Sequence, residues 1–126
     1  MTDAPADTHE RESDPLISVI MPCFNAAPYV EEAIESVLGQ TYRNVELVVV
    51  DDGSTDGSDA IVAALVAANP ERVNIAYTSR VGPYPARNAG LERAHGVLIA
   101  FLDADDWWLP DALEKLHAAV ASEVTS

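Results

Sequence analysis

The sequence has little positive charge, a single cysteine and no long apolar run. Its seven Lys and Arg residues against 21 Asp and Glu give a formal net charge of −14, which argues against nucleic acid or an anionic membrane surface as the main partner. The single cysteine, Cys23, excludes an internal disulfide. No apolar run approaches the roughly 20 residues of a membrane-spanning helix, and the acidic N-terminus lacks the apolar stretch of a signal peptide. We therefore expect no transmembrane segment and a cytoplasmic location.

The length and composition indicate one globular domain behind a polar tail. A chain of 126 residues is one domain at most, and 48% hydrophobic residues are enough to form a core. Residues 1–15 are polar and acidic and contain two prolines, which predicts a disordered tail. The folded domain is expected over residues 16–126.

Apolar runs and helical patterns alternate along this domain. Four short apolar runs predict strands, and helix start signals with apolar side chains at helical spacing predict a helix after each run. This alternation implies an α/β fold, an open parallel sheet with helices on both faces and right-handed crossovers. The predicted strands are residues 16–21, 45–50, 73–78 and 97–102, and the helices are expected to begin at Pro28, after Gly57, at Pro85 and at Pro110.

Three of the predicted strands end in unusual polar segments. Residues 22–25 follow the first run, residues 51–54 the second and residues 103–106 the fourth. In an open parallel sheet these ends meet at one edge, where ligands bind. Residues 103–106 carry three carboxylates that repel one another, and hard cations such as Mg²⁺ or Mn²⁺ favour oxygen ligands of this kind. The sequence therefore predicts a binding cleft with a divalent-metal site.

Other chemistries of parallel sheets fit these residues less well. A dinucleotide-binding fold or a P-loop needs a glycine-rich turn after a strand, but residues 22–29 contain no glycine and the only lysine is Lys115. A haloacid-dehalogenase-like phosphotransfer site stays open for Asp103 and Asp105. That fold, however, places its aspartate pair after the first strand and uses a supporting lysine.

Five ordered segments carry a family resemblance: ISVIMPCFN at 17–25, ESVLGQTY at 35–42, ELVVVDDGSTD at 46–56, ARNAG at 86–90 and DADDWWLP at 103–110. Together they resemble family 2 glycosyltransferases over about residues 16–120, and the ordered set is highly specific. The resemblance implies a Rossmann-like GT-A fold. This chain would be its N-terminal half, which binds a nucleotide-diphosphate sugar.

The resemblance implies a subsite for the nucleotide base at the first two strand ends. Pro22, Phe24 and Asn25 would lie beside the base. Phe24 departs from the more usual tyrosine, which keeps the stacking surface but loses a hydroxyl contact. Asp52 would accept a hydrogen bond from the ring N–H of the base, with Asp51 nearby, and hydrogen bonds to charged groups are the stronger kind.

The resemblance also implies roles around the diphosphate and the metal ion. Arg87 would approach the base or the diphosphate, with a structural ion pair as the alternative. Asp105 of the D-x-D pair would bind Mn²⁺ or Mg²⁺, and Asp103 would face the ribose or join the metal site with its water shell. Asp106 would support them. A divalent ion neutralises the charge that develops on a diphosphate leaving group.

The implied activity is inverting transfer of a sugar from a nucleotide donor, with a UDP-sugar favoured, to the hydroxyl of an unknown acceptor. The family's general base lies beyond the D-x-D loop, so no catalytic residue is assigned. We expect a chain truncated after this loop and the next helix. A non-catalytic nucleotide-binding or partner module derived from the family is the alternative. An unpaired fourth strand would also expose an apolar edge, which predicts self-association.

Overall fold

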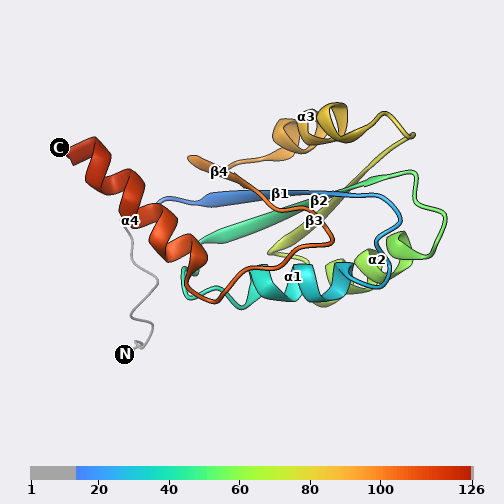
Figure 1. Ribbon diagram of the computed structural model, residues 1–126, viewed down its shortest axis with the longest axis horizontal. Coiled ribbons are helices and arrows are strands. Elements are labelled where there is room, and N and C mark those ends of the chain that lie inside the picture. Colours follow the sequence, from blue (N-terminus) through green and yellow to red (C-terminus); the bar gives the residue numbers. More distant parts are fainter. Residues whose placement is uncertain (1–13, 126) are drawn as a thin grey trace.

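Strands and helices alternate along the computed structural model, which describes residues 14–125. The four strands form one parallel sheet in the order β3-β2-β1-β4. In Figure 1, α3 lies on one face of this sheet and α1 and α2 lie on the other. The predicted open parallel sheet with helices on both faces is therefore confirmed. The elements are β1 Ile17–Cys23, α1 Val30–Leu38, β2 Val45–Asp52, α2 Ser58–Ala68, β3 Val73–Thr78, α3 Pro83–Arg93, β4 Leu98–Phe101 and α4 Ala112–Thr125.

Strand β2 supplies side chains to two apolar cores, one on each face of the sheet. Leu47 and Val49 belong to the larger core with α1 and α2, whereas Val48 and Val50 belong to the smaller core with α3. All four are at most 1% exposed, as expected for a parallel strand covered on both faces. The continuous apolar run thus places the end of β2, and the two aspartates there, in the middle of the sheet edge.

The helices begin close to the expected signals. Helix α1 buries four apolar side chains at positions i, i+3, i+4 and i+7 from Val30, which is the spacing of one helical face. Helix α3 begins at Pro83, two residues before the expected Pro85, because the fixed φ of proline suits a first helical turn. Gly90 lets α3 approach the sheet, since a Cβ atom there would lie 2.6 Å from Ile20 Cγ2.

The ends of three strands differ from the prediction. Strand β1 was expected to stop at residue 21 but continues to Cys23. Strand β2 was expected to stop at residue 50 but includes Asp51 and Asp52, because Asp51 pairs with both β1 and β3 and Asp52 pairs with β3. Strand β4 was expected over residues 97–102 but is limited to Leu98–Phe101, where it pairs with β1 alone. Ladder hydrogen bonds from two neighbours therefore extend a strand into polar sequence.

Strand β4 forms one edge of the sheet, as predicted, within the part of the chain that the structure describes. Helix α3 packs over β1 and β2 rather than over this strand. Consequently Val97, Ile99 and Phe101 are 74%, 37% and 46% exposed. The apolar edge is confirmed, and the self-association inferred from it stays a prediction.

The expected tail, residues 1–15, lies mostly outside the described residues, which begin at Asp14. Asp14 and Pro15 are tied to the domain, because their carbonyl oxygens accept hydrogen bonds from the Asn44 amide and the Tyr42 hydroxyl. Among residues 14–125, no helix combines the length and the apolar character needed to cross a membrane.

Candidate functional site

A cavity of about 470 Å³ opens at the carboxyl ends of the strands, the edge where open parallel sheets bind ligands. Its volume is in the range of small-molecule sites. Of the predicted site residues, Asp51 and Asp106 lie outside its lining. The others come from the ends of β1 and β2, from the loops that follow β1 and β4, and from α3. The complete lining is Pro22, Cys23, Phe24, Asn25, Ala26, Tyr29, Asp52, Arg80, Pro83, Ala86, Arg87, Asp103, Ala104 and Asp105.

The loop after β1 presents Phe24 and Asn25 at the cavity. Asn25 has a left-handed φ of 50°, which this residue type tolerates better than most. Its backbone N–H donates to Ser54 Oγ at 2.9 Å, and its side-chain Oδ1 accepts from the Thr55 N–H at 2.7 Å. These bonds join the loops after β1 and β2, so Asn25 is a structural link as well as a lining residue.

Two further bonds strengthen this link between the loops. The Ala26 N–H donates to Ser58 Oγ at 2.9 Å, and the Ala27 N–H donates to Asp56 Oδ2 at 3.0 Å. Hydrogen bonds, first from the Ser58 hydroxyl and then from backbone N–H groups, lower the pKa of Asp56 below its ordinary value. The start of α2 is thereby held against the start of α1, and this arrangement supports the aromatic side of the cavity.

Asp51 and Asp52 point to opposite faces of the sheet, because successive side chains of a strand alternate. Asp51 is buried, and its Oδ2 accepts from the Ser54 N–H at 3.2 Å. It lies in register with Cys23, whose thiol pKa is raised to about 11 by burial and then by the Asp51 charge. Asp51 does not line the cavity, and its expected place near the base stays a prediction.

Asp52 lies at the cavity and is enclosed by the loop between β3 and α3. Its Oδ1 accepts from Thr78 Oγ1 at 2.7 Å and from the Val81 N–H at 2.8 Å. Its Oδ2 accepts from the Gly82 N–H at 2.9 Å and from Arg80 at 3.3 Å. Burial alone would raise the pKa of this carboxyl, but the hydrogen bonds and the Arg80 charge outweigh burial and lower it.

Arg80 is a cavity residue that the sequence analysis did not identify. Its guanidinium carbon lies 3.6 Å from the centroid of the Phe24 ring, in a cation–π contact, and its backbone φ of 53° is left-handed. The unusual polar segments follow the first, second and fourth strands, whereas Arg80 follows the third. A basic residue two positions after a predicted parallel strand was the available signal.

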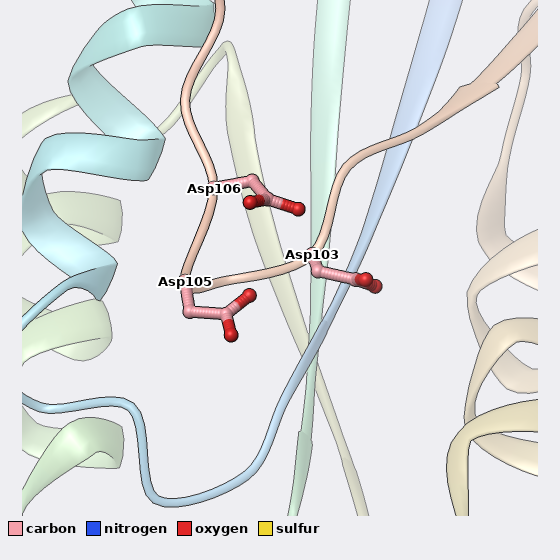
Figure 2. A group of neighbouring side chains, drawn as sticks. All are labelled: Asp103, Asp105 and Asp106. Carbon is pink, nitrogen blue, oxygen red and sulfur yellow. The ribbon is translucent and has the colours of Figure 1, made fainter.

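The loop after β4 presents three carboxylates, Asp103, Asp105 and Asp106, which we call the acidic triad. In Figure 2 all three side chains extend toward the right of the view. The triad is exposed, whereas Ala104 between its members is buried and anchors the loop in the larger core. The Asp106 N–H donates to the Asp103 carbonyl at 3.0 Å, which closes a tight turn. The turn therefore aims carboxylates outward from a fixed point.

The acidic triad fits a hard divalent cation. One oxygen from each carboxylate lies within 4.8 Å of the others, and opposite ligands of an octahedral Mg²⁺ are about 4.2 Å apart. Small side-chain movements would therefore bring the three oxygens onto one ion. Carboxylate oxygens are also the donor type that Mg²⁺ and Mn²⁺ prefer.

Arg87 on α3 lies between the acidic triad and two aromatic rings. Its guanidinium is 3.5 Å from Asp103 Oδ1, and it lies 5.5 Å from the centroid of Tyr84 and 6.0 Å from that of Phe101. Asp103 is about half exposed, so the ion pair is screened by water. The structure thus contains the ion pair that was the alternative for Arg87, and also places the residue at the cavity.

Gln40 supports the loop that carries the acidic triad, which we call the acidic loop, and was not singled out from the sequence. This side chain is fully buried. Its Nε2 donates to the carbonyls of Ser36 and Leu109 at 3.0 and 2.7 Å, and its Oε1 accepts from the Leu113 N–H at 2.9 Å. The Trp108 N–H also donates to Ser36 Oγ at 3.2 Å. The segment after the triad is therefore clasped to the end of α1.

Comparison with known proteins decides the family. The model of glycosyl transferase family 2 matches residues 18–125. The chain belongs to this family. Among relatives of the chain, an uncharacterized glycosyltransferase of Haemophilus influenzae is 48% identical over 102 residues, which are 80% of this chain and 40% of that protein. The chain thus spans about two fifths of the length of this family 2 relative.

Two solved structures show the same arrangement of elements. TarS of S. aureus in complex with UDP-GlcNAc is 32% identical with a TM-score of 0.76, and the match covers 85% of this chain and 31% of TarS. The mannosyltransferase PcManGT of Pyrobaculum calidifontis in complex with GDP-Man and Mn²⁺ is 33% identical with a TM-score of 0.75. That match covers 93% of this chain and 33% of PcManGT. The family 2 chain therefore has the GT-A type of α/β fold that its sequence implied.

Proposed function

We propose that this chain binds the nucleotide-diphosphate sugar donor of a family 2 glycosyl transferase, together with Mn²⁺ or Mg²⁺, and that a UDP-sugar is the favoured donor. The observation that carries this proposal is the convergence of Phe24, Asn25, Asp52 and the acidic loop on one cavity. A planar base, a sugar and a diphosphate need an aromatic surface, hydrogen-bond acceptors and a cation, in that order along the ligand. The likeness to TarS with UDP-GlcNAc and to PcManGT with GDP-Man and Mn²⁺ supports the same donor class.

The base would be held at the side of the cavity formed by the loops after β1 and β2. Phe24 is 41% exposed and would stack on the base, while Pro22 and Asn25 would border it. Asp52 carries the charge that would accept the ring N–H of uracil or guanine. A buried carboxylate whose pKa is lowered stays ionised at neutral pH, which keeps it a strong acceptor.

The diphosphate would be held at the opposite side, between α3 and the acidic loop. Asp105 and Asp103 would bind the divalent ion, with Asp106 as a further carboxylate of the same group. When bound, the ion would neutralise the charge that develops on the diphosphate as the sugar leaves. Arg87 would add a positive charge at the diphosphate, since its pairing with Asp103 at 3.5 Å is long and partly exposed.

Transfer to an acceptor hydroxyl with inversion is part of the proposal, as is a general base outside the residues assigned here. Release of UDP that depends on an added acceptor would support transfer. A non-catalytic nucleotide-binding module would bind UDP but show no such release. The proposed location is the cytoplasm, where the buried free thiol of Cys23 would stay reduced. Cell fractionation tests the location, and recovery outside the cytoplasmic fraction would contradict it.

Titration calorimetry with UDP and GDP, each with and without Mn²⁺, tests donor binding. We expect UDP to bind only with Mn²⁺, because the diphosphate and the acidic triad repel one another without a cation. The higher affinity for UDP than for GDP should therefore also appear only with Mn²⁺. Binding of neither nucleotide, or binding that Mn²⁺ does not change, would overturn the donor site. Tighter binding of GDP would overturn only the preference for UDP.

We also propose that a second copy of this chain pairs with the β4 edge. The outer backbone groups of Leu98–Phe101 lie at the sheet edge, beside the exposed Ile99 and Phe101, and such edges favour strand pairing. Light scattering should detect dimers that increase with concentration, and Ile99→Lys should restore the monomer. A wild-type chain that stays monomeric at all concentrations would contradict this proposal.

A further inference from the structure

The contact between Arg80 and Phe24 fills a surface that a nucleobase would use. The guanidinium carbon lies 3.6 Å from the ring centroid, which is the contact distance of two planar groups lying face to face. Both side chains line the cavity. A base therefore cannot stack on this face of Phe24 while the guanidinium of Arg80 remains there.

In Asp52, the proposed acceptor for the base N–H, all of the acceptor sites are also occupied by donors from the protein itself. An ionised carboxylate has about four acceptor sites, and Asp52 receives four donors, two on each oxygen. Three of them are 2.7–2.9 Å away, and the fourth, Arg80, is 3.3 Å away. A base N–H can reach Asp52 only if one donor leaves, and Arg80 is the longest and most exposed of the four contacts.

The backbone of Arg80 is fixed, but its side chain is not enclosed. The next two residues, Val81 and Gly82, donate their N–H groups to Asp52. Gly53 lies against Arg80, since a Cβ atom at Gly53 would come within 3.2 Å of Arg80 Cγ. By contrast, the Arg80 side chain is 57% exposed. Its guanidinium can therefore rotate into solvent without moving the loop.

We infer that Arg80 occupies the base subsite in the free protein and is displaced when the nucleotide base binds. The inference rests on the proposed function, because it takes the cavity to be a nucleotide site. One rotation of one side chain would free both the face of Phe24 and one acceptor position of Asp52. The base would then replace the guanidinium in both contacts, as a flat group on the ring and as an N–H donor to the carboxylate. Arg80 thereby lowers the affinity for the nucleotide in proportion to the time it spends in the subsite.

Arg80→Met tests this inference, because methionine keeps the apolar stem and removes the guanidinium. Exposed cation–π contacts and exposed ion pairs are both weak, so we expect the affinity for UDP with Mn²⁺ to rise about three- to tenfold. If Arg80 instead contacted the bound nucleotide directly, Arg80→Met would lower the affinity. A fall in affinity, or no change, overturns the inference.

Arg93→Met is the matched control. Arg93 lies at the end of α3, exposed and 3.5 Å from Asn74, at the far end of the helix from the cavity-lining Pro83. Its replacement changes the net charge by the same amount, and we expect an unchanged affinity for UDP. A similar rise in both variants would mean that general charge, rather than the place of Arg80, sets the affinity, and this would also overturn the inference.

NMR of the wild-type chain separates this inference from the proposed function. In the free protein the Arg80 Nε–H signal should be shifted by the ring current of Phe24, and Phe24→Leu should remove the shift. Saturation with UDP and Mg²⁺, which unlike Mn²⁺ does not broaden the signals, should also remove it. Binding of UDP with the shift intact would overturn the displacement of Arg80 alone. If neither the wild type nor Arg80→Met binds UDP, both the donor site and this inference are overturned.

Discussion

Asp52 and the acidic triad lie at or beside the cavity but differ in burial and in hydrogen-bond partners. Asp52 is 4% exposed and receives four hydrogen-bond donors. Asp105 and Asp106 are exposed, and among the described residues no hydrogen bond or ion pair reaches their carboxylates. Within residues 14–125, the Asp103 carboxylate has only its long ion pair with Arg87. Aspartates at the ends of β2 and β4 thus lie in opposite electrostatic environments.

This difference indicates a division of labour. A carboxylate that fixes a loop must be desolvated and compensated by donors, because a buried charge without partners is costly. Carboxylates that are to bind a cation must instead keep their oxygens available, and the repulsion among them favours the ion. We therefore expect changes at Asp52 to affect stability first, and changes in the acidic triad to affect ligand binding first.

The largest expected effect is on stability, from Asp52→Asn. The asparagine NH2 group would face either Thr78 and the Val81 N–H or Arg80 and the Gly82 N–H. In either orientation one backbone N–H would lose its acceptor. We expect a loss of about 2–4 kcal/mol in the free energy of unfolding, measured by urea denaturation. Asp105→Asn should change the same quantity by about 0.5 kcal/mol at most, because its side chain is exposed. Equal losses of stability in the two variants would contradict the expected difference between Asp52 and Asp105.

The next largest effect is a loss of stability on replacing Gln40, which holds the segment after the acidic triad. Gln40→Leu would leave the Leu113 N–H and the Leu109 carbonyl without their buried partner, which should cost about 2 kcal/mol of stability. Gln40→Glu should lose at least as much stability, because its fully buried carboxylate would face the Ser36 and Leu109 carbonyls without a donor. If Gln40→Leu were as stable as wild type by urea denaturation, the hydrogen bonds of Gln40 would not be stabilising the loop.

A smaller effect concerns the metal ion. Asp105→Asn should weaken Mn²⁺ binding by about tenfold, equivalent to about 1.4 kcal/mol, because it removes one of the three charged ligands. Electron paramagnetic resonance of free Mn²⁺ measures this without any nucleotide. Asp111→Asn is the matched control, since Asp111 is partly exposed and pairs with Lys115 rather than with the triad. A tenfold loss in both variants would assign the effect to net charge.

Much of the fold follows from patterns in the sequence. The apolar run before Asp51 predicted a central strand covered on both faces, and β2 is that strand. Turn and proline signals placed the starts of α1 and α3 within about two residues. The strand ends were less predictable, because backbone pairing with the adjacent strands extends β2 through two charged residues. Side-chain composition does not report such pairing.

The site was predictable in its residues but not in their partners. Strand-end position and family resemblance selected Phe24, Asn25 and the D-x-D pair, and all of these line the cavity. The position of Asp51 away from the cavity depends on which face of β2 it occupies once the strand extends to Asp52. Arg80 reaches the cavity through a loop held by Asp52, and such a long-range contact leaves no local periodicity to detect.

The smallest effect is a change in how stability depends on pH. Because the folded state lowers the pKa of Asp52, the stability that this carboxylate contributes is complete above its unfolded pKa of about 3.9 and is lost as the pH falls through the lower folded pKa. Urea denaturation between about pH 7 and about pH 3 should therefore show a shallower acid loss in Asp52→Asn than in wild type. Some loss should remain, since the pKa of Glu46 is also lowered: burial opposes this, but hydrogen bonds from Ser18 and His95 outweigh it. An acid loss in Asp52→Asn as steep as in wild type would mean that the four donors do not stabilise the charged form of this aspartate.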